Sequence, residues 1–397
     1  MARARRILIV VHSYYVRDTR PRRIGTALAA NGWEVDVVCA RDGGEAPREE
    51  VDGVHIRRLP ARRRRGSRFR YVFEYMSFTL LALAYVTAKH LRRRYDVVYV
   101  IGIPNFLVFA GLAPRLLGAR VLLDMRDPLP EFFQSKYAFA DDHPVTRLLR
   151  LEERLSSRFA SSVVTVHDSM ATLFERSVPR ERIAVVANAP DPRLFDLPPA
   201  SVQRDPEDRT MLYTGTLGAH YGIDLAIRAL GRLAPEMPRL RLRIVAKNLG
   251  DFLPVLRGIA RAERVEDRVV FNDPVPLDQV PAIVASAWAG VQPGRDDPLM
   301  RYSLSAKILE WARLGLPVIV GETAPLRELF GDEVLFHPAG DLEALCERIR
   351  EAHADPEGLR ARAARARATA GRLSYDEQVN ALLAVLEGGE RSSRRAM

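Results

Sequence analysis

The chain has 397 residues, which is too long for one ordinary hydrophobic core and predicts two domains. Its 47% hydrophobic and 28% charged residues are typical of a globular protein and exclude a chain that is disordered throughout. The two cysteines, Cys39 and Cys346, are far apart in the sequence and form no CxxC pair. We therefore expect neither a disulfide scaffold nor a zinc site, and the pattern suits a reducing cytoplasm.

The formal net charge of +10 is concentrated in one segment. Eight arginines lie between Arg57 and Arg70, and three more follow at Arg92 to Arg94. Two interpretations stay open: a solvated loop, and contact with an anionic membrane surface or a lipid phosphate. No recognition motif or interleaved aromatic pattern accompanies the arginines, so nucleic acid is not expected as a partner.

Two apolar stretches are too short to direct secretion or to cross a membrane. Residues 7–11 are fewer than the core of a signal peptide needs, so they predict a first buried strand. Residues 75–88 are too few for a membrane span, which needs about twenty residues. We expect a cytoplasmic protein, with peripheral contact at the inner face of the membrane as the open question. The alternative is that residues 71–91 form a buried helix of the first domain.

Short apolar runs alternate with amphipathic segments in the first half, as in a parallel sheet with crossover helices. The strands predicted there are residues 6–11, 34–39, 54–59, 97–101, 120–124, 162–166 and 183–186. A helix is predicted before the second of them, because Ile24, Ala27 and Leu28 share one face and Asn31 and Gly32 form its end. Residues 1–190 are expected to form one open α/β domain.

A proline-rich polar stretch, residues 191–210, predicts a linker. The alternation then restarts, with strands predicted at residues 211–214, 242–245, 269–271, 289–292, 318–320 and 334–336. Residues 211–374 are expected to form a second open α/β domain. Residues 341–388 are rich in Ala, Leu, Glu and Arg and are expected to be helical.

Ligands of an open parallel sheet bind beyond the carboxyl ends of its strands, so the residues that follow each strand are candidates for chemistry. His12, Asp18 and Arg20 follow the first strand, where they either face a phosphate or solvate the start of a helix. Arg126 and Asp127 follow the strand at residues 120–124. Asp127 is a candidate general base or anchor of an acceptor hydroxyl, and the alternative is an ion pair beside a proline turn.

The second domain contains a helix that is predicted over residues 306–314, with Ser305 as its N-cap. Such an N-terminus holds phosphate through free backbone N–H groups and the helix dipole. Lys307 lies on the first turn, where a cation is unfavourable unless an anion is present. Glu310 follows one turn later, and acidic side chains commonly hold ribose hydroxyls. The alternative is a surface Lys–Glu pair.

A glycine-rich turn precedes this helix in the sequence. Gly215 and Gly218 let the backbone approach a ligand closely, and the turn is expected to form a second wall of a phosphate pocket. No Asp-x-Asp, HxxxH, Walker loop or GxGxxG occurs, so no metal ion is expected at the diphosphate.

These stretches together resemble family 4 of the retaining glycosyltransferases, which have the GT-B fold. The likeness spans nearly the whole chain and is carried by residues 18–36, 124–130, 183–191 and 305–317, of which the last is the most specific. It implies two Rossmann-like domains that face each other across a cleft, the first for the acceptor and the second for the nucleotide sugar. It also implies that a final helix, at about residues 375–390, packs back on the first domain.

The reaction that follows is the metal-independent, retaining transfer of a hexose-like sugar from a nucleotide-diphosphate donor. The acceptor is a glycan, a lipid-linked sugar or a small molecule, as in polysaccharide biosynthesis, and no cofactor besides the donor is expected. The expected catalytic residues are Lys307, Glu310 and Asp127. The expected donor-binding residues are Gly215, Thr216, Gly218, Tyr302, Ser303, Ser305, Lys307 and Glu310. The expected acceptor-side residues are His12, Asp18, Arg20, Arg126 and Asp127.

The chain departs from the family pattern at two positions that bear on activity. Tyr302 stands where the family's first glutamate touches the donor sugar, and Tyr221 stands where a basic residue is common. Two alternatives therefore stay open: a nucleotide-sugar 2-epimerase of the same architecture, and a catalytically silent partner subunit that kept the fold.

Overall fold

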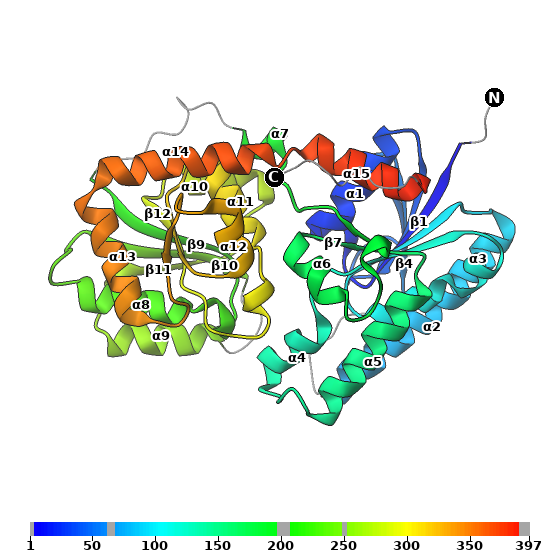
Figure 1. Ribbon diagram of the computed structural model, residues 1–397, viewed down its shortest axis with the longest axis horizontal. Helices are drawn as coiled ribbons and strands as arrows, with labels where there is room; N and C mark the ends of the chain where they lie inside the picture. Colours follow the sequence, from blue (N-terminus) through cyan, green and yellow to red (C-terminus); the bar gives the residue numbers. More distant parts are fainter. Residues whose placement is uncertain (1–3, 62–67, 197–206, 248–251, 389–397) are drawn as a thin grey trace. The chain divides into compact units, whose positions relative to one another are not determined.

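The computed structural model describes residues 4–61, 68–196, 207–247 and 252–388, which form two compact units (Figure 1). The first unit contains the chain up to Asn188 together with the residues from Asp376 onward. The second unit runs from Ala189 to Tyr375. Each unit is a sheet of mostly parallel strands covered by helices, which confirms the predicted α/β fold class.

The first unit is built on an eight-stranded sheet in the order β3-β4-β2-β1-β5-β6-β7-β8. The strands are β1 (Arg6–Val11), β2 (Glu34–Ala40), β3 (Arg48–Val51), β4 (Val54–Leu59), β5 (Val97–Ile101), β6 (Arg120–Asp124), β7 (Ser162–Thr165) and β8 (Ile183–Val185). The central strands β1, β5 and β6 are almost wholly buried, because apolar runs of this kind need cover on both faces of the sheet. The edge strand β3 pairs antiparallel with β4 and was not predicted, since its sequence Arg-Glu-Glu-Val has no apolar pattern.

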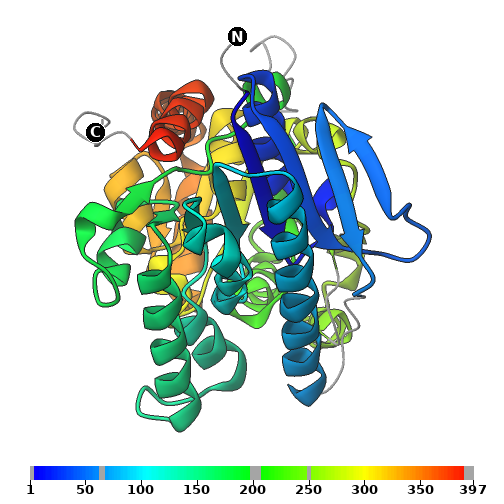
Figure 2. The same ribbon diagram turned by 90° about the vertical axis from the view of Figure 1, so that its right-hand side faces the viewer.

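The helices of the first unit alternate with these strands. They are α1 (Thr19–Ala30), α2 (Arg68–Arg92), α3 (Leu112–Leu116), α4 (Leu129–Tyr137), α5 (Pro144–Phe159), α6 (Asp168–Phe174) and α15 (Tyr375–Glu387). A 3-10 segment, η2 (Asn105–Gly111), contacts both α2 and α5, which lie on either side of it (Figure 2). α15 joins this unit from the far end of the chain: Leu382 and Leu386 are buried in its core, and Arg120 donates hydrogen bonds to the carbonyls of Val385 (2.7 Å) and Leu386 (3.0 Å).

The second unit has a six-stranded, wholly parallel sheet in the order β11-β10-β9-β12-β13-β14. The strands are β9 (Arg209–Thr216), β10 (Leu240–Lys247), β11 (Val269–Asn272), β12 (Ala289–Gln292), β13 (Val318–Gly321) and β14 (Leu335–His337). The helices are α7 (Pro192–Phe195), α8 (Ile223–Leu233), α9 (Phe252–Ala262), α10 (Val280–Ala285), α11 (Ala306–Arg313), α12 (Ala324–Phe330), α13 (Leu342–Ala354) and α14 (Pro356–Arg372).

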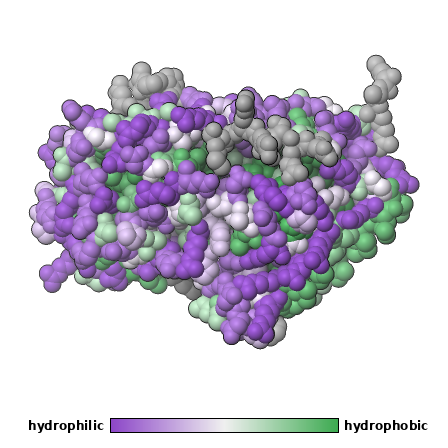
Figure 3. All heavy atoms as spheres, viewed as in Figure 1, coloured by the Kyte–Doolittle hydropathy of each residue, from purple (hydrophilic) through white to green (hydrophobic). Residues whose placement is uncertain are grey.

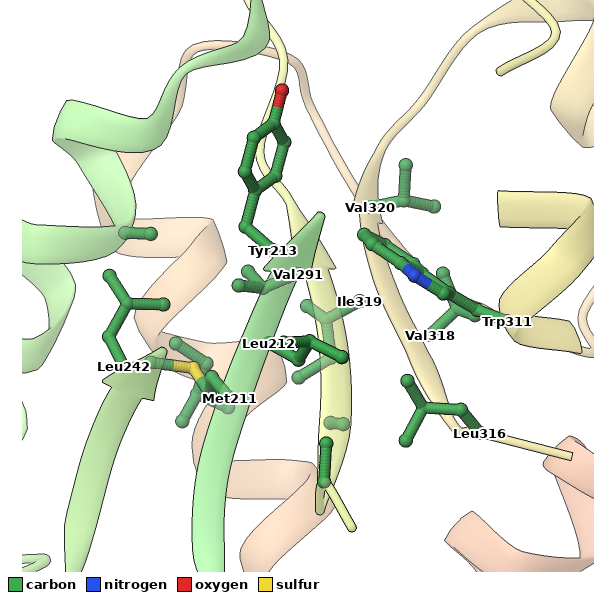
Figure 4. Close-up of a cluster of buried hydrophobic side chains, with 14 of the residues drawn as sticks. Met211, Leu212, Tyr213, Leu242, Val291, Trp311, Leu316, Val318, Ile319 and Val320 are labelled. Atoms are coloured by element: carbon green, nitrogen blue, oxygen red, sulfur yellow. The ribbon is translucent and has the colours of Figure 1, made fainter. Parts of the chain in front are cut away.

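The core of the second unit lies between β9, β13 and α11. Trp311 of α11 lies there near Val318 and Val320 of β13, whereas Met211 of β9 lies beside Leu242 on the other side of the strand (Figure 4). Burial of these large side chains fixes the distance between α11 and the sheet, because protein interiors are close-packed. The core therefore determines where the first turn of α11 is placed.

The stretch that the sequence predicts as a linker is partly structured. Its residues 192–195 form α7, and Phe195 is buried in the core of the second unit. β9 begins at Arg209, two residues before the predicted strand. No helix among residues 4–61, 68–196, 207–247 and 252–388 is long and apolar enough to cross a membrane.

Candidate functional site

The candidate donor site of the second unit is built where β9 ends and α11 begins. Tyr213 of β9 is buried in the core of the second unit, and its hydroxyl points toward the carboxyl end of the sheet (Figure 4). The Nζ atom of Lys307 donates a hydrogen bond of 2.9 Å to the Tyr213 hydroxyl, which donates in turn to the Thr216 carbonyl at 2.6 Å. Two elements that are distant in sequence thus meet at Lys307.

Aromatic rings surround the Lys307 ammonium. Its Nζ atom lies 4.3 Å from the ring centroid of Tyr213 and 4.0 Å from that of Tyr221. Burial lowers the pKa of Lys307 to about 7, and the nearby Glu310 carboxylate opposes this shift. The ring faces favour the cation while the loss of water disfavours it, so an anion bound here would stabilise the charged form.

The N-terminus of α11 faces the same region with no side chain capping it. Ser305 occupies the N-cap position as predicted, but its hydroxyl donates to Gln292 Oε1 at 3.4 Å instead of capping the helix. The helix is held from behind by Trp311, whose indole N–H donates to Thr214 Oγ1 at 3.1 Å. Glu310 lies on the turn after Lys307, as predicted.

Glycines bring backbone close together around this site. Gly215 has a φ of 127°, and a Cβ atom there would lie 3.1 Å from Lys307 Cε. At Gly222 a Cβ atom would lie 2.6 Å from the Gly294 carbonyl oxygen, and at Gly321 it would lie 1.9 Å from that of Pro293. The loops that follow β9 and β12 and the last residue of β13 therefore pack backbone against backbone at the carboxyl end of the sheet. The part that the Pro293-Gly294 loop plays in the site was not predicted, because no local sequence pattern indicates its contact with Gly222.

The remaining predicted donor residues lie on the segment that leads into α11. Tyr302 ends a 3-10 turn, η8 (Met300–Tyr302), and the Ser303 carbonyl accepts a hydrogen bond of 3.1 Å from Thr323. His220 also belongs to the site and was not predicted. Burial lowers the pKa of His220, with Asp297 raising it and Lys307 lowering it further, so all three charges lie near one another. The position of His220 inside the glycine-rich turn is the sequence feature that could have identified it as a site residue.

The polar cluster of the first unit begins with Asp124, the last residue of β6. The buried carboxylate accepts hydrogen bonds from Arg20 Nε (2.9 Å) and from the Tyr99 hydroxyl (2.6 Å). Arg20 is itself buried and also donates to the Val186 carbonyl and to Asn188 Oδ1. Arg20 connects α1 to the ends of β6 and β8 from within the fold, and the prediction that it lies on the acceptor side stays a prediction.

The outer part of this cluster consists of the half-buried Asp18 and Arg126 and the exposed Asp127. Arg126 forms an ion pair of 3.2 Å with Asp18, at the N-cap position of α1, and Asp127 beside it is exposed. His12 is instead buried, with its ring 5.0 Å from Tyr75 and 4.7 Å from Phe78 of α2. His12 packs between β1 and α2, where the apolar surface of an imidazole suits the position, and its place on the acceptor side stays a prediction. Within the part of the chain that the structure describes, no three His, Cys, Asp or Glu residues are grouped to hold a metal ion.

Both units match known sequence families. Residues 18–189 match the family described as Glycosyl transferase 4-like domain, and residues 198–369 match the family described as Glycosyl transferases group 1. Over 184 residues the chain is 32% identical to the GDP-mannose-dependent alpha-(1-6)-phosphatidylinositol monomannoside mannosyltransferase of Mycolicibacterium smegmatis, covering 44% of this chain and 46% of that protein. Over 206 residues it is 26% identical to the D-inositol 3-phosphate glycosyltransferase of Segniliparus rotundus, covering 50% of this chain and 45% of that protein. The chain thus matches about half the length of these curated relatives.

Solved structures share the fold over nearly the whole chain. The sucrose-phosphate synthase of Thermosynechococcus elongatus superposes with a TM-score of 0.79 at 19% identity, covering 97% of this chain and 98% of that one. WaaG, a glycosyltransferase involved in lipopolysaccharide biosynthesis, gives a TM-score of 0.71 at 17% identity, covering 96% and 100%. HepE of Anabaena, solved in complex with UDP, gives 0.70 at 17% identity, covering 96% and 99%.

Proposed function

The chain belongs to the group 1 glycosyltransferases with the GT-B fold, and from this premise we propose how it binds its donor and transfers the sugar. The donor is a nucleotide-diphosphate sugar held by the second unit. The observation that carries this proposal is Lys307, which lies on the uncapped first turn of α11 and contacts the strand end at Tyr213 and Gly215. We propose that the diphosphate binds at this turn and that Glu310 binds the ribose.

Lys307 and the N-terminus of α11 supply the positive charge that transfer requires. Negative charge grows on the departing diphosphate in the transition state, and fixed donors aimed at that charge lower the barrier. The leaving phosphate would help to deprotonate the acceptor, and the configuration at the sugar would be retained. Retention and independence from metal ions are parts of the proposal that rest on the resemblance to family 4 and on this cationic turn.

The acceptor side is proposed from the first unit. The exposed Asp127 and the half-buried Asp18–Arg126 pair lie at the carboxyl ends of the first sheet, where ligands of such sheets bind. Asp127 would anchor or deprotonate the acceptor hydroxyl. The curated relatives named above act on an inositol phosphate or a phosphatidylinositol mannoside, which supports a phosphorylated or lipid-linked acceptor, used in the cytoplasm at the inner face of the membrane.

The donor site is tested by replacing its two charged residues. We expect Glu310→Ala to weaken nucleotide-sugar binding, and Lys307→Ala to lower kcat by roughly 100-fold with little change in donor affinity. Lys136→Ala and Glu357→Ala, which remove the same charges elsewhere, serve as controls and are expected to leave kinetics unchanged. Wild-type kinetics in both site variants would show that the donor binds elsewhere. Donor binding without turnover in the wild type would support the silent-partner alternative.

Metal independence has its own measurement. Activity is expected to survive dialysis against EDTA, because Lys307 and the helix N-terminus take the place of a cation at the diphosphate. A chelated enzyme that loses turnover and regains it with added Mg²⁺ or Mn²⁺ would contradict this part of the proposal.

A further inference from the structure

Helix α2 exposes apolar side chains along the face that points away from the sheet. Phe78, Ala82 and Val86 are buried on its inner face, whereas Phe73 is 72% exposed, Leu80 is 59% exposed and Met76 is also exposed on the opposite face. The spacing of residues 73, 76, 80, 84 and 91 follows one side of a helix. A helix that is apolar on both sides normally needs a second partner.

The exposed apolar surface continues over the neighbouring helices. Leu116 of α3 is 78% exposed and Leu148 of α5 is 63% exposed; also exposed are Leu112 of α3, Leu117 directly after it, and Leu151 and Leu155 of α5. α2 contacts α3, and η2 lies between α2 and α5. A band of hydrophobic residues is visible along the edge where α2 and α3 are drawn in Figure 1 (Figure 3). We call the outer faces of α2, α3 and α5 the apolar face.

Arginines are interleaved with the leucines on α5. Arg147, Arg154 and Arg158 are exposed beside Leu148, Leu151 and Leu155, and none of these arginines forms an ion pair with a residue that the structure describes. The acidic residues of α2, α3 and α5 are Glu74, Glu152 and Glu153, and none of them is exposed. The apolar face therefore carries positive charge without a negative counterpart.

We propose that the apolar face docks the first unit onto an anionic lipid bilayer. Apolar side chains that enter the boundary between headgroups and acyl chains, with arginines that pair with lipid phosphates, are the chemistry of an interfacial amphipathic surface. Exposure of so large an apolar patch to water is unfavourable. Such a patch therefore marks an interaction site. Two copies of the chain would not cover it well, because a two-fold contact would bring arginines against arginines with no carboxylate between them.

The arginine run at residues 57–70 is not the centre of this surface. Arg58 is only 3% exposed and forms ion pairs with Glu45 and Glu49, and Arg57 lies over the ring of Tyr85. The arginines at positions 62–65 lie outside the described residues, as do the side chains of Arg68 and Arg70. The sequence predicted membrane contact through the whole arginine run, whereas we place this contact on the outer faces of α2, α3 and α5. This inference rests on the proposed function only in that a lipid-linked acceptor would give the docking a purpose.

The test is co-sedimentation of the full chain, without nucleotide sugar, with phosphatidylcholine vesicles and with vesicles that also contain phosphatidylglycerol. We expect binding to the anionic vesicles only, weaker at high salt. Replacing Arg147, Arg154 and Arg158 together by Gln is expected to weaken binding roughly 100-fold. Replacing Leu148, Leu151 and Leu155 together by Ser is expected to weaken it by at least about tenfold.

Matched control variants carry the same chemical changes on the second unit. The triple change of Arg241, Arg360 and Arg365 to Gln and the triple change of Val255, Val270 and Leu277 to Ser also alter exposed residues. Both controls are expected to bind vesicles as the wild type does. Thermal unfolding of every variant, and a second apolar variant with Phe73→Ser and Leu80→Ser on α2, separate loss of docking from loss of fold.

The outcomes discriminate between the inference and the proposed function. Equal binding to both kinds of vesicle, no binding to either, or unchanged binding by the α5 variants would overturn the inference. A dimer in light scattering that the leucine variant dissolves, with no vesicle binding, would assign the face to a second copy instead. Vesicle binding by an enzyme that turns over no nucleotide sugar would leave the inference standing and overturn the proposed function.

Discussion

At the scale of single residues, Lys307 determines what the second unit can do. Its ammonium lies between two tyrosine rings and against a glycine, and burial lowers its pKa to about 7. Glu310, His220 and the hydroxyl of Tyr213 are the polar groups that face it. An ordinary lysine would be fully charged at neutral pH, so here the charge itself depends on pH and on the ligand.

This predicts a pH dependence of catalysis. Lysine is charged below its pKa, so the form that stabilises the diphosphate is lost as the pH rises through about 7. We expect kcat/KM, which reports the free enzyme, to fall on the alkaline side with an apparent pKa near this value. The alkaline limb of the kcat profile should lie at a higher pH than that of the kcat/KM profile, because the bound diphosphate stabilises the charged form of Lys307.

Lys307→Arg is the control for that prediction, since arginine stays charged over the whole range. Its kcat/KM is expected to lose the alkaline limb even if the variant is slower overall. An unchanged alkaline limb in Lys307→Arg would assign the titration to another group.

At the scale of secondary-structure elements, the position of α11 depends on its contact with β12. A Cβ atom at Gly290 would lie 2.4 Å from the Trp311 ring, so only glycine lets the indole pack flat on the strand and reach Thr214. This packing sets the height of the first turn of α11 above the sheet, and with it the position of the proposed diphosphate site.

Gly290→Ala is therefore expected to destabilise the second unit by about 1–3 kcal/mol, the usual cost of an overpacked core. Gly258→Ala is the matched control: it lies in α9, and no atom is within 4 Å of its added methyl group. Alanine is the better helix former, so this change is expected to stabilise the unit by about 0.5–1 kcal/mol. Urea unfolding of both variants measures the two effects, and equal midpoints would contradict the packing argument.

The buried network at the end of β6 shows how another set of elements is joined. Arg20 connects α1 to Asp124 of β6 and to the chain after β8. Tyr99 connects β5 to the same Asp124 carboxylate. A buried charged pair with several hydrogen bonds is costly to break from one side only, so these residues hold the strand ends and α1 together.

At the scale of the whole molecule, the chain forms two hydrophobic cores and its last helix returns to the first of them. Leu382 of α15 is buried with the first sheet although nearly the whole second unit precedes it in sequence. The two units are thus connected twice, by the chain near residue 189 and again near residue 375.

Calorimetry is expected to separate the two cores. Leu382→Ala should lower the transition of the first unit, because a buried leucine truncated to alanine costs about 2–5 kcal/mol. Leu345→Ala, in α13 of the second unit, is the matched change and should lower the other transition. A nucleoside diphosphate added in excess should raise only the transition that Leu345→Ala lowers. A single transition that responds to both variants would contradict independent units.

The strands could be predicted because each is a short apolar run between polar loops. Arg6–Val11, Val97–Ile101 and Arg120–Asp124 have the predicted bounds, since burial on both faces requires continuous hydrophobicity. β3 was missed because it is an exposed edge strand, and edge strands need no apolar pattern. The membership in the family was also predictable, because residues 305–317 carry a dense local pattern.

What the sequence by itself determined is therefore the fold class, the family and the helix on which Lys307 and Glu310 lie, since all of these follow from local patterns of hydrophobicity and charge. The tertiary structure alone decided that Arg20 and His12 are buried supports, that Gly222 meets Gly294, and that α2 has a second apolar face open to solvent. These facts depend on contacts between residues that are distant in the sequence. A side chain's burial is a property of its neighbours in space, and no pattern along the chain records them.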